Sequence, residues 1–462
     1  MKISTIKSEG LASLSYFVVS RDEAVVIDPR RDVEVYTRLA ERSEVAITHI
    51  LETHRNEDYV IGSLELHSTF PESKIAHSKA TSFKYGNINL DDQDTITVGD
   101  MLITCLNTPG HTDDSMCYVV ADRSVSTDPI VAFTGDTLFV NSVGRTDLVD
   151  IKKHEDMSRK MYHSLHERLL KLPDGVVIRP GHGSGSVCGG DIGSREFSTI
   201  GFERKHNIWL SMEEDEFIQR KVKQRLTTAS YFKHCEHLNT IGAPLLSEQP
   251  IAREVEIGEF ETLLKQEKHR AIDIRSSLQF TVGHIPGTIS LSIHNMGLLV
   301  GLALRPTQNF SIIFENNMDE LKLAKAMLHR IGYDDIRGYL RNGIESWTKS
   351  GRELRSIESM SLEVFGAYQT RSELDIIDVR EPHEFVEERI EGSRSIPLSD
   401  FGEEAATIDS DRFIATICPR GNRGTTAASI LLREGKTDVK VSMDGLKAWK
   451  DQDFPLIHGS DE

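Results

Sequence analysis

The chain has 462 residues, which is too long for one hydrophobic core, and usual domain sizes predict about three folding units. With 38% hydrophobic and 27% charged residues, the composition is that of a globular protein and not of a disordered one. Acidic residues exceed basic ones by 72 to 54, and the formal charge of −18 would repel nucleic-acid phosphates and anionic lipids, so neither is expected as a partner.

The N-terminal segment lacks the unbroken apolar core and the cleavage site of a secretory signal, and no later apolar run is long enough to span a bilayer. The five cysteines are odd in number and form no CxxC pair, which argues against a disulfide framework. Cys105 and Cys117 lie in apolar, strand-like stretches and are expected to be buried and inert. We therefore expect a cytoplasmic protein with reduced thiols.

The first part of the chain, to about residue 205, alternates short β-rich runs with turns and helical stretches, as in AVVID, AITHIL and MLITCL. This order predicts an α/β fold. Polar residues of interest follow the apolar runs, at strand ends where open α/β folds gather their ligands. Residues from about 205 to 250 are predicted to be a helical and then loop-like connector, so we expect residues 1–248 to form one domain with its connector.

Four short polar segments follow apolar runs here: HRNEDY beginning at His54, PGH ending at His111, Gly135-Asp136, and PGH ending at His182. If the preceding strands lie side by side, His54, His111 and Asp136 can meet in one cleft. Two imidazoles and one carboxylate on one face of an octahedron leave three open positions, which suits a mononuclear non-haem Fe(II). The competing interpretation is that histidines only satisfy buried backbone groups. It is what we expect of His67, His77, His154, His163 and His166.

The order and spacing of these segments resemble the metallo-β-lactamase superfamily over nearly the whole first domain, which implies an αββα sandwich. Members that hydrolyse esters or lactams usually have H-x-H-x-D-H at the first segment, where the additional histidines build a two-zinc site. Here Asn56 and Tyr59 replace two of those histidines, so both metals of such a site lose a ligand. The iron-dependent persulfide dioxygenases of the superfamily use three ligands that are all present, as His54, His111 and Asp136.

The resemblance also implies roles for neighbouring side chains. Asp58 and His182 would orient the ligands or bind the approaching thiol, and Asn56 and Tyr59 would line the open face.

Two further positions resemble the persulfide dioxygenase branch. Arg145 lies in a G-R-T-D stretch. Two roles remain open for this side chain: an ion pair with Asp147 that holds the loop, and a contact with the substrate. Cys188, in a Gly- and Ser-rich loop, resembles a cysteine of the dioxygenase–rhodanese fusions that would accept sulfur near the metal. The alternative that Cys188 lies at the surface by chance, without a role, is equally open.

The second half contains an internal repeat, in which AIDIRSSLQFTVGHIPGTISL aligns with IIDVREPHEFVEERIEGSRSI. Asp273 and Arg275 match Asp378 and Arg380, each pair being 105 positions apart. Two copies of one domain of roughly a hundred residues are the simplest account, with predicted bounds of 249–352 and 353–462.

The strand-like FIATI is followed by CPRGNRG, from Cys418 to Gly424, and then by a helical stretch. A loop that leads into a helix N-terminus directs backbone N–H groups at the cysteine sulfur, which is expected to lower its pKa, and Arg420 and Arg423 add positive charge. Such a cradle would hold Cys418 as a thiolate and then as a persulfide. Pro419 removes one N–H donor from it.

With IIDVREPHEF upstream and MDGLKAWKDQDFPL downstream, this part resembles a rhodanese domain, an α/β domain with a parallel sheet. The interval from Cys418 to Arg423 matches the six-residue loop of sulfurtransferases, whereas related phosphatase domains have a loop one residue longer. In the earlier copy the equivalent position is Phe314 and no cysteine is near, so we expect a structural or docking domain. Asn316 and Asn317 are the alternative candidates for a binding role there.

Fusions of persulfide dioxygenases to rhodanese domains are a known architecture, and the chain resembles them from end to end. The resemblance implies one Fe(II) per chain, with zinc as the alternative metal, and oxidation of a thiol persulfide by O₂ to sulfite. The thiol would be glutathione, coenzyme A or another small thiol. Cys418 would either load persulfide for the iron site or transfer sulfane sulfur to sulfite, giving thiosulfate. The protein would be a homo-oligomer, either a dimer or a tetramer. Two other functions remain open: a zinc-dependent thioesterase of the glyoxalase II type, and a non-catalytic sulfur carrier or sensor with a relic metal domain.

Overall fold

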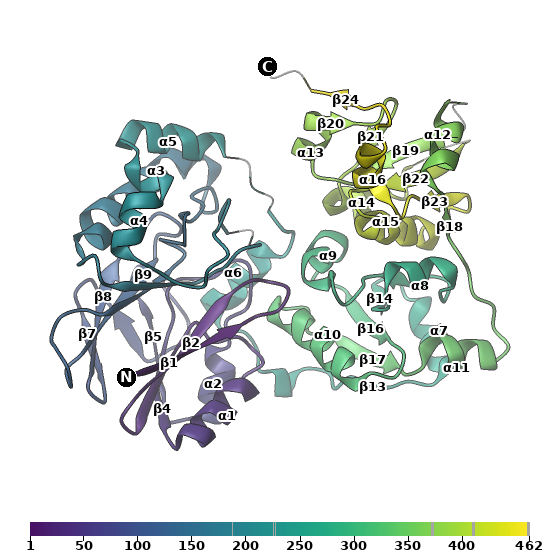
Figure 1. The fold of residues 1–462 in the computed structure, drawn as a ribbon. Helices are drawn as coiled ribbons and strands as arrows, with labels where there is room; N and C mark the ends of the chain where they lie inside the picture. The colour runs from purple at the N-terminus through teal and green to yellow at the C-terminus, as the bar shows by residue number, and fades with distance from the viewer. Residues whose placement is uncertain (187, 225, 227, 371–373, 409–411, 460–462) are drawn as a thin grey trace. The chain divides into compact units, whose positions relative to one another are not determined.

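The computed structural model describes residues 1–186, 188–224, 226, 228–370, 374–408 and 412–459. The chain forms two compact units, and Figure 1 labels many of their strands and helices. The first unit comprises Met1–Thr228, Phe232–Leu246 and His329–Gly332, and the second comprises Ala229–Tyr231, Ser247–Leu328 and Tyr333–Glu462.

Two six-stranded mixed sheets form the centre of the first unit within the described residues. The first sheet is ordered as the chain runs: β1 (Lys2–Lys7), β2 (Leu14–Ser20), β3 (Glu23–Ile27), β4 (Ala46–Leu51), β5 (Lys74–Ser78) and β6 (Ile88–Leu90). The second is likewise ordered: β7 (Thr95–Val98), β8 (Met101–Asn107), β9 (Met116–Asp122), β10 (Val131–Gly135), β11 (Val177–Pro180) and β12 (Ser198–Thr199). Pairing is parallel from β3 to β6 and between β10 and β11, and antiparallel elsewhere.

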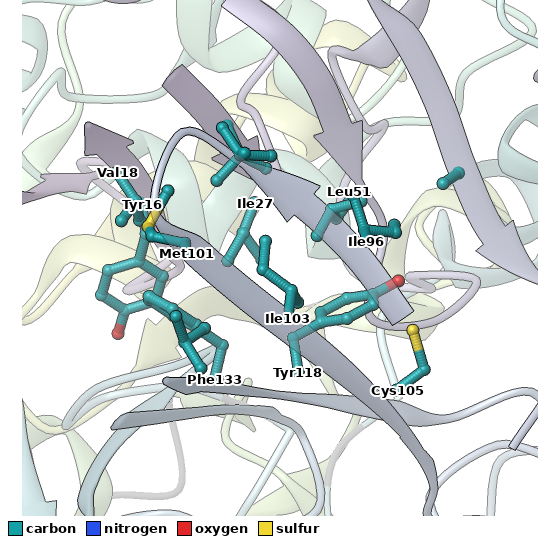
Figure 2. Close-up of a cluster of buried hydrophobic side chains, with 14 of the residues drawn as sticks. Tyr16, Val18, Ile27, Leu51, Ile96, Met101, Ile103, Cys105, Tyr118 and Phe133 are labelled. Carbon is teal, nitrogen blue, oxygen red and sulfur yellow. The ribbon is translucent and has the colours of Figure 1, made fainter. Parts of the chain in front are cut away.

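Successive side chains along each strand point to opposite faces of its sheet. One set faces the core between the two sheets, and the other set faces the outer layers. Strand β9 is buried along its whole length because both of its faces are covered. Its Tyr118 faces the core between the sheets, whereas Cys117 packs on the helix side. Figure 2 shows the inter-sheet core, where the rings of Tyr16 and Phe133 come from different sheets and have centroids 5.0 Å apart.

Helices cover the outer face of each sheet (Figure 1). On the first sheet, α1 (Glu34–Ser43) buries Tyr36 and Ala40, one helical turn apart, and α2 (Ser63–Thr69) buries Leu66. The second sheet is covered by α3 (His154–His163), η2 (Ser164–Arg168), η3 (Leu169–Lys171), α4 (Ile200–His206), η4 (Ile208–Ser211) and α5 (Glu214–Lys223). Three further short elements are η1 (Ile151–Lys153), α6 (Phe232–Ile241) and η5 (Leu246–Glu248). The expected αββα sandwich is confirmed.

The second unit contains two five-stranded parallel sheets with equivalent strand orders, within the part of the chain that is described. The first is β13 (Arg253–Glu254), β17 (Ile336–Leu340), β16 (Asn309–Ile313), β14 (His269–Asp273) and β15 (Ile289–Ser290). The second is β18 (Glu358–Ser359), β23 (Val439–Val441), β22 (Phe413–Ile417), β19 (Leu374–Asp378) and β21 (Arg394–Ser395), and β20 (Glu388–Arg389) pairs separately with β24 (Ile457–His458). The internal repeat and its parallel sheets are therefore confirmed.

The helices of the two copies also correspond in order. The first copy has α7 (Ile257–Leu264), α8 (Ser277–Val282), α9 (Met296–Ala303), α10 (Met318–Arg330) and α11 (Gly343–Lys349). The second has α12 (Leu362–Thr370), α13 (Pro382–Glu387), α14 (Leu398–Glu404), α15 (Asn422–Arg433) and α16 (Gly445–Asp451). The repeated Asp–Arg pairs have the same geometry, with shortest contacts of 2.6 Å between Arg275 and Asp273 and 2.7 Å between Arg380 and Asp378. These residues are scaffold in both copies.

All five cysteines lie in the described part of the chain, and each is buried. Burial raises the pKa of the Cys105 thiol to about 12 and that of Cys117 to about 11, which fits the expected inert role. Across the described residues, no helix combines the length and the apolar character needed to cross a membrane.

Candidate metal centre and cysteine loop

The candidate metal ligands come from the ends of strands in both sheets of the first unit. His54 follows β4, His111 follows β8 and Asp136 follows β10. Their ligand atoms all lie within 4.8 Å of one another, and all three side chains are buried. The imidazole rings of the two histidines meet edge to face, with centroids 5.0 Å apart. The structure thus brings these three side chains together, while their role as ligands stays a prediction.

The atoms that face each other in this cluster suit a cation. Nε2 of His54 and Nε2 of His111 are buried and make no hydrogen bond of good geometry in the described structure, and His111 Nε2 has an ion-pair contact with Glu57 Oε1 at 3.1 Å. Such atoms are rare, because an unsatisfied buried polar group costs about 1–3 kcal/mol. The nearer oxygen of Asp136 lies 3.5 Å from His111 Nε2. A divalent metal ion would satisfy both nitrogens and the carboxylate, so the donor set fits the group that the motif implies.

The other nitrogen of each imidazole is held by a hydrogen bond. Nδ1 of His54 lies 2.9 Å from Thr53 Oγ1, whose own proton is donated to Asp28 at 2.7 Å. Nδ1 of His111 lies 2.9 Å from the backbone carbonyl of Arg145. Both partners therefore accept from Nδ1, and in the neutral imidazole this leaves the Nε2 lone pair for a metal.

Asp58 and His182 form a buried chain with Asp136. Nδ1 of His182 lies 2.8 Å from Asp136 Oδ1, and its Nε2 lies 2.8 Å from Asp58 Oδ2. Burial opposes protonation of His182, but the two carboxylates raise its pKa well above the ordinary value. Burial alone would raise the pKa of Asp136, but His182 and the other two histidines hold it below its usual range. Asp136 is therefore kept in the anionic form that can bind a cation.

Asn56 and Tyr59, which replace zinc-binding histidines of the hydrolase motif, are both buried. The amide of Asn56 donates to the backbone carbonyl of His54 at 3.2 Å, a contact within its own loop. The Tyr59 ring lies edge-on to the His182 ring, with centroids 6.2 Å apart. Burial raises the pKa of Tyr59 well above the ordinary value, so its hydroxyl is neutral. Tyr59 is thus beside the cluster, whereas the Asn56 amide is used to hold the loop.

Arg145 and Cys188 lie in two loops that are joined through their backbones, since the N–H of Arg145 donates to the Cys188 carbonyl at 3.0 Å. Arg145 donates to both oxygens of Asp147, at 2.7 and 2.9 Å, so the loop-holding ion pair is present. Cys188 is fully buried, and the interpretation of an accidental surface position is wrong. Its thiol donates to Glu57 at 3.6 Å, and burial together with the nearby charges of Asp58 and Glu57 raises its pKa well above the ordinary value.

Sequence reasoning missed three residues of this site: Asp28, Thr53 and Glu57. Asp28 ends the AVVID run and Thr53 precedes His54, so the strand-end rule that selected the other residues was a usable signal for both. Glu57 stands at a position that the H-x-H-x-D-H motif leaves variable, and nothing in the motif indicates it. Burial would lower the pKa of His111, but Glu57, 3.1 Å from its Nε2, raises it to about 9.

Cys418 lies in the loop between β22 and α15 of the last copy, where the Gly424 N–H donates to its sulfur at 3.3 Å. Burial raises the pKa of the Cys418 thiol, and the N–H groups of Gly424 and Arg420 and the charge of Arg423 oppose this rise without cancelling it. The expected lowering of the Cys418 pKa is therefore wrong, because a side chain that is only 2% exposed is strongly desolvated. Arg423 also pairs with Glu384 at 2.7 and 2.9 Å, and the side chain of Arg420 is exposed.

In the first copy, Phe314 occupies the position equivalent to Cys418 and is fully buried, and Asn316 and Asn317 beyond it are exposed. This copy contacts the helix that follows Cys418: Ser290 N–H donates to Ser429 Oγ at 3.1 Å, and the Thr426 hydroxyl donates to the Ser290 carbonyl at 2.8 Å. These contacts fit the expected structural or docking role of the copy.

Comparison with known proteins agrees with this architecture. Residues 9–182 match the metallo-beta-lactamase superfamily, and residues 256–350 and 362–452 match the rhodanese-like domain. The mitochondrial persulfide dioxygenase ETHE1 of Bos taurus is 30% identical over 209 residues, which cover 44% of this chain and 72% of that relative. The probable hydroxyacylglutathione hydrolase glo2 of Schizosaccharomyces pombe is 32% identical over 161 residues, covering 34% of this chain and 57% of that relative.

Among solved structures, a metallo-beta-lactamase from Staphylococcus aureus subsp. aureus COL superposes with a TM-score of 0.66 at 28% identity, over 74% of this chain and 99% of that chain. The likeness therefore extends beyond the residues that match the metallo-beta-lactamase superfamily. The chain belongs to the metallo-β-lactamase superfamily, in the group that includes the persulfide dioxygenase ETHE1, and it is a fusion of one such domain with two rhodanese-like domains.

Proposed function

We propose that this protein oxidises a low-molecular-weight thiol persulfide with O₂ and transfers sulfane sulfur through Cys418. The observation that carries the first half is the buried convergence of His54, His111 and Asp136, with ligand atoms within 4.8 Å of one another. When bound there, Fe(II) supplies electrons and open coordination positions for a sulfur ligand and O₂ together, which no side chain provides. The likeness to ETHE1 persulfide dioxygenases supports the same substrate class.

The side chains of the site have separate tasks in this proposal. Thr53 and the Arg145 carbonyl orient the two imidazoles through Nδ1, and His182 keeps Asp136 anionic. The enclosure of these groups excludes bulk water from the reacting sulfur. Overall, one persulfide, one O₂ and one water give one thiol, one sulfite and two protons, so that the terminal sulfur is oxidised and O₂ is reduced.

Cys418 carries the second half of the proposal. A persulfide on this residue has an electrophilic outer sulfur, which sulfite attacks. A new S–S bond forms in thiosulfate, the bond to Cys418 breaks, and its electron pair returns to the Cys418 sulfur as a thiolate. The Gly424 N–H, 3.3 Å from that sulfur, stabilises the leaving thiolate. Because both activities share one chain, sulfite, the sulfur acceptor, forms at a raised effective concentration for the Cys418 persulfide.

The oxidation is tested by O₂ uptake with glutathione persulfide after anaerobic loading with iron. His111→Ala is expected to lose both bound iron and uptake, because it removes one of three ligands. His163→Ala is the matched control, since that imidazole is partly exposed on α3 and lies outside the cluster. Equal uptake by the wild type and His111→Ala would end the dioxygenase proposal.

Metal analysis of the purified protein separates this function from the alternatives. About one iron per chain supports the dioxygenase, about two zincs support a hydrolase of the glyoxalase II type, and no metal supports a sulfur carrier or sensor.

A further inference from the structure

Glu57 lies in the loop after β4, and its carboxylate faces the cluster of candidate ligands. The side chain is only 4% exposed. Its Oε1 lies 3.1 Å from His111 Nε2, and its Oε2 lies 3.9 Å from His54 Nε2. An oxygen of Glu57 is also within 4.8 Å of an oxygen of Asp136. The carboxylate therefore shares one small space with all three candidate ligands.

The atoms around this space lack other partners. Oε2 of Glu57 and the Nε2 atoms of His54 and His111 are buried without a hydrogen bond in the described part of the chain. Two carboxylates, Glu57 and Asp136, bring negative charge into this enclosed space. A divalent metal ion would compensate the charge of these two carboxylates.

The separations match those of ligands around one small ion. Ligands about 2.1 Å from a divalent metal lie about 3.0 Å apart when adjacent in an octahedron and about 4.2 Å apart when opposite. In the structure, Glu57 Oε1 lies 3.1 Å and Asp136 Oδ2 lies 3.5 Å from His111 Nε2, and the other Glu57 oxygen, Oε2, lies 3.9 Å from His54 Nε2. All three distances fall within this interval, so each oxygen of Glu57 lies at a ligand-like distance from one of the two imidazole nitrogens.

We propose that Glu57 is a fourth protein ligand of the metal, which is then held by two imidazoles and two carboxylates. This inference rests on the metal site of the proposed function and refines it. Two carboxylates balance the charge of a divalent ion, and with one oxygen of each coordinating, an octahedral ion keeps two open positions. Two is the number that a persulfide sulfur and O₂ require together.

Cys188 acts on the site through the same carboxylate. Its thiol donates at 3.6 Å to Glu57 Oε1, the same oxygen that lies 3.1 Å from His111 Nε2, and this contact fixes the orientation of the carboxylate. Cys188 and His111 therefore contact the same side chain from two different loops. In this arrangement Cys188 is a positioning residue for the ligand Glu57.

The test compares Co(II) binding by the metal-free wild type, Glu57→Gln and Glu52→Gln. Glu52 is the matched control, because it is a buried carboxylate just after β4 whose two oxygens accept from Tyr85 at 3.0 Å, away from the cluster. Burial raises the pKa of Glu52 to about 8, so an amide resembles its neutral form. Affinity is measured by competition with a chelator, and coordination by the visible absorption of bound Co(II).

Glu57→Gln is expected to bind Co(II) at least about tenfold more weakly, with a changed absorption spectrum, whereas Glu52→Gln matches the wild type. An unchanged affinity and spectrum in Glu57→Gln would overturn the proposal. If that variant does not fold, a crystal structure of the Co(II)-loaded wild type decides: a Glu57 oxygen about 2.0–2.2 Å from the metal supports coordination, and one beyond about 3 Å refutes it.

These measurements need neither O₂ nor a persulfide. If Glu57→Gln loses Co(II) affinity but the iron-loaded wild type shows no persulfide-dependent O₂ uptake, the dioxygenase function fails and the ligand assignment stands. If uptake is present but Glu57→Gln binds Co(II) as the wild type does, only the assignment of Glu57 fails.

Discussion

The hydrogen bond from His54 to Thr53 allows a sharp test of how the metal site is organised. In Thr53→Val the side chain keeps its shape, but Nδ1 of His54 loses an acceptor at 2.9 Å and Asp28 loses a hydroxyl donor at 2.7 Å. Asp28 keeps the backbone N–H of residue 53, at 2.8 Å, so the loop retains one of its two anchors. The substitution thus removes the orientation of an imidazole while leaving the candidate ligands in place.

The expected loss follows from the burial of these groups. An unsatisfied buried donor costs about 1–3 kcal/mol, and in metal sites the loss of such an outer partner lowers affinity by about 10- to 100-fold. In free energy of binding, that range corresponds to about 1.4–2.7 kcal/mol. We expect Thr53→Val to fall within it, measured by anaerobic competition for Fe(II) or Co(II) with a chromophoric chelator.

The chain provides a closely matched control for this variant. Thr48, on β4, also has its hydroxyl beside the following histidine, with Oγ1 3.0 Å from His49 Nδ1, and His49 is not part of the cluster. Thr48→Val should bind metal as the wild type does. If Thr53→Val also retained the wild-type affinity, the hydrogen bond would not organise the site and the reasoning would be refuted.

Three further predictions concern Cys418, a glycine beside Asp136 and a buried lysine. Cys418→Ala is expected to lower thiosulfate formation from persulfide and sulfite by more than about 100-fold, measured by chromatography, while O₂ uptake persists; unchanged thiosulfate would contradict its role. In Gly181→Ala a Cβ would lie 2.5 Å from Asp136 Oδ1, and such overpacking should cost about 1–3 kcal/mol and lower the thermal midpoint. Gly183→Ala, where the nearest atom would be 3.9 Å away, is its control, and equal midpoints would count against the clash. Burial lowers the pKa of Lys221 from 10.5 to about 7, so the unfolded chain binds more protons between these values and stability should rise with pH across that window. Lys221→Met should lack that contribution. If the thermal midpoints of the two proteins changed with pH in the same way from pH 7 to 10.5, the prediction for Lys221 would be refuted.

The sequence by itself was sufficient to predict the architecture and to select the three candidate ligands. The order of strands and polar turns around His54, His111 and Asp136 is a local pattern that places each residue after a strand, although the packing of the two sheets is what brings His54 to the other two residues. The repeat of Asp273 and Asp378 was equally visible, because each copy is a contiguous segment. The replacement of a cysteine by Phe314 needed only an alignment of the two copies.

The tertiary structure alone decided the properties that depend on distant segments. Glu57 and Cys188 are 131 positions apart, and only the folded loops reveal that they share a hydrogen bond beside the candidate metal ligands. The pKa of Cys418 is raised because desolvation outweighs the loop dipoles, a balance that depends on how completely the rest of the domain covers the sulfur. Residue types and their order determine which groups are available for chemistry, whereas burial and side-chain direction are set by packing between segments far apart in the chain, which no local pattern encodes.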